Sequence, residues 1–108
     1  QVHTFAAMMS WAGCDRLARI AEHLGLPERA TYWRDRATPM RRELLERAWD
    51  ATHGRFSSVL DGAELDATLL LLPEFGLVEG TDPRFLATLE AVQARLGRGR
   101  WLMRYAHP

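Results

Sequence analysis

Several ingredients are scarce in this chain of 108 residues, and each scarcity excludes a class of structure or partner. The single cysteine, Cys14, excludes an internal disulfide and a cysteine metal cluster, and it fits a reducing cytoplasm as the location. Acidic and basic residues balance at a net charge of zero, so nothing favours nucleic acid or an anionic membrane as a partner. No apolar run approaches the length of a membrane span, and no signal peptide is visible.

Lysine is absent, so all 14 basic residues are arginines. Guanidinium groups keep their charge and present planar forks of donors, which suit ion pairs and hydroxyl-rich ligands. Glycine-rich phosphate loops, paired-histidine metal motifs and nucleophile elbows are also missing. The histidines lie far apart in the sequence and are interpreted as surface or loop residues: His3, His23, His53 and His107. We therefore expect no cofactor and no metal site.

Apolar periodicity and the residues that begin and end helices predict four helical segments. They cover residues 4–24, 27–49, 62–72 and 83–96. Asp61 and Glu64 form a potential capping box before the third segment, and a loop is expected between the second and third. Very apolar segments alternate with amphipathic ones, which is typical of inner and outer helices. The sequence therefore predicts an all-α chain of two αα-hairpins that forms part of a ring, with no extensive sheet and no separate domains.

A few side chains are candidates for chemistry. Asp66 lies among leucines and alanines, so its carboxylate needs a partner such as an arginine or helix-end amides, and a structural use is favoured over a catalytic one. Trp11 suits either core packing, which is the commoner use of large aromatics, or stacking on a sugar ring. Arg104 lies between Trp101 and Tyr105, and it is either a sugar-binding donor in a loop or half of a surface ion pair.

Short motifs follow one another along essentially the whole chain. They are W-A-G-C-D-R at 11–16, A-W-D at 48–50, G-R-F at 54–56, E-L-D-A-T-L-L-L-L-P at 64–73, D-P-R at 82–84 and R-Y at 104–105. Each is uninformative alone, but in this order they resemble the family-fifteen glycoside hydrolases, the glucoamylase and trehalase-like enzymes. The chain is therefore interpreted as an internal fragment of such a catalytic domain, and its first residue, Gln1, fits that interpretation.

The resemblance implies an (α/α)6 toroid of inner and outer helices and an inverting mechanism on α-glucosidic bonds. In that mechanism one carboxylic acid protonates the leaving oxygen while a carboxylate activates water on the opposite face of the sugar. In the family the acid lies upstream of the H-T-F sequence at 3–5 and the base lies downstream of R-Y. We therefore expect no catalytic residue within this chain and no activity from the chain alone.

The resemblance also assigns roles to individual side chains. Arg104 matches the family's sugar-contacting arginine, Tyr105 stands beside it, and Trp11 would lie on an inner helix just beyond the acid motif. These three are the expected substrate-binding residues, with an α-glucan or trehalose as the carbohydrate substrate. Structural roles are expected for three further residues: Asp15, Arg16 and Asp66.

Two other interpretations compete with an enzyme fragment. One is an αα-repeat binding or structural module without catalysis, although the sequence has no internal repeat of fixed period. The other is a structural piece that self-associates, because the apolar segment at 61–72 has only three other helices to cover it. Some family members have polar residues in place of Ala6 and Ala7, and others differ at Pro39, which leaves the substrate open.

Overall fold

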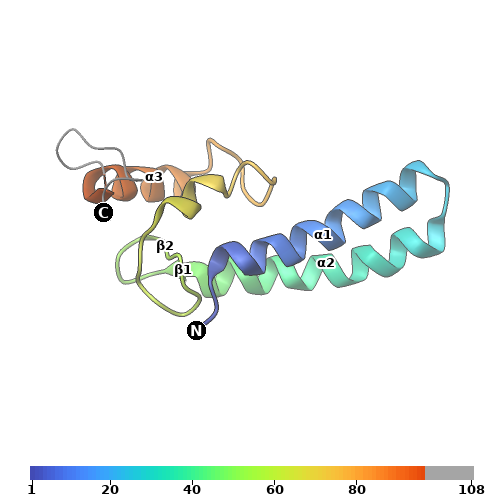
Figure 1. The fold of residues 1–108 in the computed structure, drawn as a ribbon, viewed down its shortest axis with the longest axis horizontal. Helices are drawn as coiled ribbons and strands as arrows, with labels where there is room; N and C mark the ends of the chain where they lie inside the picture. Colours follow the sequence, from blue (N-terminus) through green and yellow to red (C-terminus); the bar gives the residue numbers. More distant parts are fainter. Residues whose placement is uncertain (97–108) are drawn as a thin grey trace.

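The computed structural model describes residues 1–96, and its longest feature is a hairpin of two antiparallel helices (Figure 1). Helix α1 spans Thr4–His23 and helix α2 spans Pro27–Ala48. Gly25 in the turn has a φ of 71°, a left-handed conformation that glycine adopts without steric cost. Pro27 takes the first turn of α2, where its missing N–H leaves no hydrogen bond unmade. The first two predicted helices are confirmed, each ending one residue earlier than expected.

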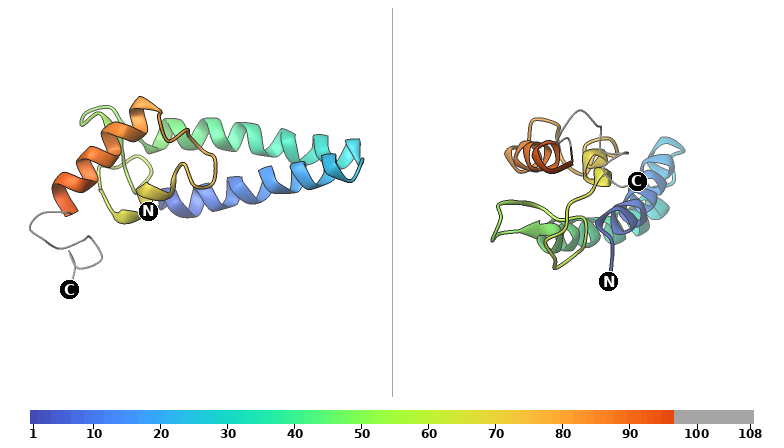
Figure 2. Two further views of the ribbon diagram at one scale, coloured as in Figure 1. Left: turned by 90° about the horizontal axis from the view of Figure 1, so that it is seen from above. Right: turned by 60° about the vertical axis from the view of Figure 1, so that its left-hand side comes forward.

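The core lies at one end of this hairpin, where the following segments fold back onto it (Figures 1 and 2). The other end projects beyond the core and carries exposed apolar side chains on α1. The apolar segment at 61–72, where uncovered surface was expected, is covered in part: Leu69 and Leu72 are only 1% exposed, whereas Leu71 is 37% exposed. Toward the projecting end the large exposed apolar side chains are Leu17 and Ile20 on α1 and Leu24 and Leu26 in the turn, while Met9 is exposed in the first half of α1.

A short antiparallel β-hairpin follows α2, where the sequence predicted only a loop. Strand β1 (Trp49–Asp50) pairs with strand β2 (Arg55–Phe56), and Trp49 lies opposite Phe56. Gly54 makes the turn at a φ of 70°. The rings of Trp49 and Phe56 meet edge to face with centroids 5.2 Å apart, a favourable aromatic geometry. Each strand has two residues, so the expectation of no extensive sheet holds for the described residues.

Helix α3 (Pro83–Leu96) packs beside this β-hairpin and has the bounds that the sequence predicted. The carboxylate of Asp82 accepts a hydrogen bond from the backbone amide of Arg84 at 2.8 Å, which caps the start of the helix. Thr88 on α3 has no exposed surface. Its hydroxyl accepts from the amide of Phe56 and donates to the carbonyl of Arg84, both at 2.8 Å. Thr88 thus fastens β2 to α3.

The third predicted helix was wrong, because only a short 3-10 helix, η1 (Ala67–Leu71), forms in that region. The backbone of Glu64 is held by an earlier loop instead. Its carbonyl accepts from the amide of Ser58 at 2.7 Å, and its amide donates to the hydroxyl of Ser57 at 3.0 Å. In an α-helix over 62–72 the carbonyl of Glu64 would accept from the amide of Thr68, but that amide donates to the carboxylate of Asp66 instead, and the helical turns begin only at Ala67.

The capping box predicted at Asp61 and Glu64 was wrong as well. Asp61 adopts a φ of 59°, a left-handed conformation that aspartate tolerates better than most residues. Its carboxylate accepts two hydrogen bonds from the guanidinium of Arg47, at 2.7 and 2.9 Å. These bonds hold the pKa of Asp61 below its ordinary value although burial opposes the shift. Asp61 therefore ties its loop to α2 and starts no helix.

The described chain is mostly helical, and the predicted all-α class is confirmed. The predicted antiparallel pairing of the first two helices is confirmed, but α1 buries only five of its 20 residues and is not the enclosed inner helix that was expected. In the second half, η1 stands in place of the expected inner helix and α3 is the amphipathic partner. Within residues 1–96, no helix combines the length and apolar character needed to cross a membrane.

Candidate functional site

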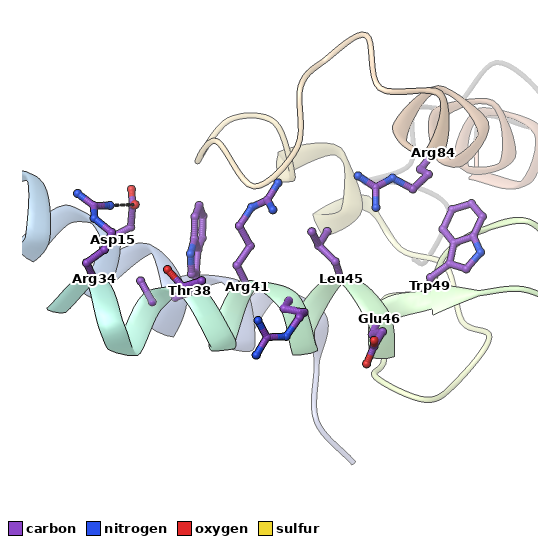
Figure 3. Close-up of a pocket in the computed structure, with 11 residues that line it drawn as sticks. Asp15, Arg34, Thr38, Arg41, Leu45, Glu46, Trp49 and Arg84 are labelled. Carbon is purple, nitrogen blue, oxygen red and sulfur yellow. Dashed lines mark hydrogen bonds and ion pairs between the residues drawn. The ribbon is translucent and has the colours of Figure 1, made fainter. Parts of the chain in front are cut away.

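A cleft of about 690 Å³ opens between the α1–α2 hairpin and the start of α3 (Figure 3). Small-molecule sites in proteins typically measure ~300–1,000 Å³, so a small ligand would fit. Tryptophans, arginines, carboxylates and small apolar residues line it: Trp11, Asp15, Arg34, Ala37, Thr38, Arg41, Arg42, Leu45, Glu46, Trp49 and Arg84. Aromatic faces beside planar guanidinium donors suit ligands that combine apolar ring faces with hydroxyl or anionic groups.

The long wall of the cleft is one face of α2. Arg34, Thr38, Arg41 and Leu45 recur at spacings of three or four residues, which places them in a row along one side of a helix. Figure 3 shows this row beneath the cleft. The spacing was visible in the sequence, but sequence reasoning treated this charged face as the solvated outside of an amphipathic helix.

Asp15, which was predicted to be structural, joins α1 to α2 at one end of the cleft. Its carboxylate lies 2.9 Å from Nε of Arg19 and 3.3 Å from Nη1 of Arg34. Arg34 also contacts the carboxylate of Glu22 at 2.9 Å. These contacts fix the position of Arg34 against α1. Arg16, which was also predicted to be structural, is exposed on α1 and does not line the cleft.

The two tryptophans of the cleft differ in exposure. Trp11 is 5% exposed and belongs to the core cluster, while one part of it also lines the cleft. Core packing is therefore present, and a sugar contact by Trp11 stays a prediction. Trp49 is partly exposed on β1, where Phe56 supports its ring from the side. Sequence reasoning did not select Trp49, which the β-hairpin places beside the cleft.

Two arginines from different elements point toward one another across the cleft (Figure 3). Nη2 of Arg41 on α2 donates to the backbone carbonyl of Leu77 at 2.8 Å. Arg84 on α3 donates to the carboxylate of Asp82 through Nε at 3.1 Å and Nη2 at 2.7 Å. This hydrogen-bonded pair raises the pKa of Arg84 and lowers the pKa of Asp82, although partial burial opposes both shifts. Neither arginine was selected from the sequence.

Asp66 lies at the start of η1 and not in the cleft. Its carboxylate accepts from the backbone amide of Thr68 at 2.9 Å and also from the hydroxyl of the same residue. A helix-end amide was one of the two partners expected for Asp66. The geometry is that of a capping residue, which agrees with a structural use.

The remaining predicted substrate-binding residues, Arg104 and Tyr105, lie outside the described residues, as does Trp101. Their sugar contacts stay predictions. The cleft described above therefore contains one of the three residues expected to bind substrate, Trp11.

An aspartate–histidine pair closes the β1–β2 turn, and sequence reasoning missed it. Asp50 is 9% exposed, and its Oδ1 accepts from the amides of Thr52 and His53 at 3.1 and 3.3 Å. Its Oδ2 lies 2.6 Å from Nδ1 of His53. Burial raises the pKa of Asp50, but these hydrogen bonds outweigh it and hold the pKa below the ordinary value. The signal available in the sequence was D-x-x-H directly before Gly54.

Metal ligands do not gather in the described part of the chain. Within residues 1–96, no group of three or more histidine, cysteine, aspartate or glutamate side chains is placed to hold a metal ion.

Comparison with known proteins identifies the class to which these elements belong. The profile of the glycosyl hydrolases family 15 matches residues 1–107, and this chain belongs to that family. A trehalase of Thermoplasma volcanium is 30% identical over 94 residues, and trehalase 2 of Sulfolobus acidocaldarius is 31% identical over 94 residues. A trehalase of Mycobacterium tuberculosis is 31% identical over 105 residues. No solved structure matches the chain at a significant level.

The relatives are much longer than this chain. The alignments cover 87% of the chain for the two archaeal proteins and 97% for the mycobacterial one, yet only 15–16% of each relative. The family resemblance read from the motifs is thus confirmed, and the all-α fold is that of a helical segment of the family's toroid.

Proposed function

We propose that the protein to which this segment belongs is an inverting glycoside hydrolase that cleaves the α-glucosidic bond of trehalose. The observation that supports this most directly is the match to family 15 along nearly the whole chain. The three relatives described above, which differ widely in source, all bear the name trehalase. An enzyme acting on longer α-glucans is the alternative within the same family.

We infer that the segment contributes scaffold and sugar contacts and that the reacting carboxyl groups lie outside it. An inverting enzyme needs two carboxyl groups on opposite faces of the sugar, roughly 6.5–9.5 Å apart. The carboxylates lining the cleft are Asp15 and Glu46. Asp15 is engaged by Arg19 and Arg34, and Figure 3 shows Glu46 pointing from α2 in a direction opposite to that of Arg41. These two carboxylates do not form such a pair.

The substrate is tested by offering trehalose, maltose and soluble starch to the full-length protein and measuring released glucose. We expect the largest kcat/KM for trehalose. A larger value for maltose or starch would replace the trehalase assignment with a glucoamylase-like one. A folded full-length protein that releases no glucose from any of the three would favour the non-catalytic helical module.

A parallel incubation uses the 108-residue chain alone. Water activation and protonation of the leaving group each need a positioned carboxyl group, so we expect no glucose above a buffer control. Turnover by the isolated chain would show that reacting groups do lie within it.

A further inference from the structure

The charges of the cleft are unevenly neutralised. Four arginines line it against two carboxylates. Arg34 is paired with Asp15 and Glu22, and Arg84 is paired with Asp82. Arg41 differs, because its hydrogen bond within residues 1–96 goes to a neutral backbone carbonyl. Among residues 1–96, Arg41 and Arg42 therefore form no ion pair with a carboxylate.

The guanidinium groups of Arg41 and Arg84 face the same space (Figure 3). Arg41 uses Nη2 in its bond to Leu77, and Arg84 uses Nε and Nη2 in its bonds to Asp82. In the described part of the chain, Nη1 of each residue, and Nε of Arg41, remain available as donors. An oxyanion between the two guanidinium groups would accept from the remaining donors of both and would balance the charge of Arg41.

Apolar surface adjoins this pair of arginines. Leu45 lies on α2 between them in Figure 3, and the partly exposed ring of Trp49 lies on the far side of Arg84. Bare oxyanions gain nothing from such surfaces, whereas the C–H face of a sugar ring packs on them. The cleft volume of about 690 Å³ also exceeds what a single oxyanion needs.

We propose that this cleft binds a small sugar that carries an anionic group, either a phosphate ester or a carboxylate. Arg41 and Arg84 hold the anionic group, and Leu45 and Trp49 contact the ring. The proposal goes beyond cleavage of trehalose, which is an uncharged sugar. It concerns binding by this segment alone, so it stands or falls independently of which glycoside the longer protein hydrolyses.

Isothermal titration calorimetry on the 108-residue chain tests the proposal with four compounds: glucose 6-phosphate, glucuronate, glucose and inorganic phosphate. At least one of the first two should bind about 10-fold or more tightly than both glucose and inorganic phosphate, because only these join an anion to a ring. The stronger of the two identifies the anionic group. The proposal would be overturned if glucose or inorganic phosphate bound as tightly as the better of glucose 6-phosphate and glucuronate, or if none of the four compounds bound.

Variants locate the binding site. Arg41→Gln and Arg84→Gln should each lower the affinity for the tightest-binding compound about 10-fold or more. Arg36→Gln is the matched control, since Arg36 is an exposed arginine of the same helix that stacks on Tyr32 at 3.6 Å and does not line the cleft. The Arg36→Gln variant should bind that compound with unchanged affinity. A control variant that loses as much affinity as the two cleft variants would contradict the site.

A second measurement guards against variants that fail to fold. In the unaltered chain, the best ligand should shift the NMR signals of the Nε–H groups of Arg41 and Arg84 and leave that of Arg36 in place. Shifts spread equally over all three arginines, or confined to Arg36, would show that the anion binds the surface generally and would overturn the proposal.

Discussion

Replacing Thr88 by valine tests how the cleft wall on the β-hairpin is held to α3. Thr88 has no exposed surface, and its hydroxyl accepts the buried amide of Phe56 at 2.8 Å. Valine has nearly the same shape but cannot accept that bond. The amide would then stay buried without a partner, because Phe56 is itself fully buried.

The expected cost follows from that one orphaned group. Leaving a buried donor unsatisfied costs about 1–3 kcal/mol of the free energy of unfolding. Urea unfolding followed by circular dichroism should show this loss in Thr88→Val. Thr31→Val, on the exposed face of α2, is the matched control and should change stability by less than about 0.5 kcal/mol.

Hydrogen exchange gives a second and more local readout. The amide of Phe56 should exchange faster in Thr88→Val than in the unaltered chain, because its acceptor is gone. Equal stability together with unchanged exchange at Phe56 would refute the link between β2 and α3.

Three further predictions concern the turn, the exposed helix and the predicted sugar contact. The lowered pKa of Asp50 means that its hydrogen bonds stabilise the fold above about pH 4 and that this stabilisation is lost as the pH falls through the lowered pKa. In thermal melts, Asp50→Asn should therefore be less stable than the unaltered chain at neutral pH and should lack this loss of stability in acid. A variant with the same stability at every pH as the unaltered chain would contradict this. The isolated chain should self-associate through the exposed apolar side chains of α1, and Ile20→Glu should shift its sedimentation toward the monomer. A compact monomer of the unaltered chain that binds no hydrophobic dye would count against this prediction. In the full-length enzyme, Arg104→Ala should cost about 2–4 kcal/mol of transition-state stabilisation and Arg104→Lys should restore part of it; unchanged kcat/KM with a normal melting temperature would remove Arg104 from the site.

Helix ends were predictable where local chemistry decides them. Gly25 and Pro27 mark the turn between α1 and α2, and Asp82 followed by Pro83 marks the start of α3. Each signal acts on neighbouring backbone groups, so its effect does not depend on distant parts of the chain.

The apolar run before Pro73 was different, because leucines on every side give no periodicity that separates a helix from a buried irregular segment. Its conformation depends on hydrogen bonds between Glu64 and the loop at 57–58, which no local pattern reveals. The pair of Asp50 and His53 differs again, because its two residues are three apart and the D-x-x-H pattern before Gly54 could have indicated it.

The cleft was predictable only in part for a related reason. Arg34, Thr38 and Arg41 share one helix face and could have been grouped from their spacing. Arg84 reaches the same space because α3 packs against β2 and the core, through contacts between segments far apart in the sequence that include the hydrogen bond of Thr88 to Phe56. The family, in contrast, could be recognised from the order of short motifs without any of these contacts.

The most direct test of the assigned function follows the anomers of glucose released from trehalose by the full-length protein. Inversion at the attacked carbon yields one β-glucose from the attacked ring and one α-glucose from the leaving ring, so early proton NMR spectra should show both in equal amounts. Release of α-glucose alone would indicate retention of configuration and contradict the inverting mechanism. Absence of any release from trehalose by the folded protein would contradict the assignment itself.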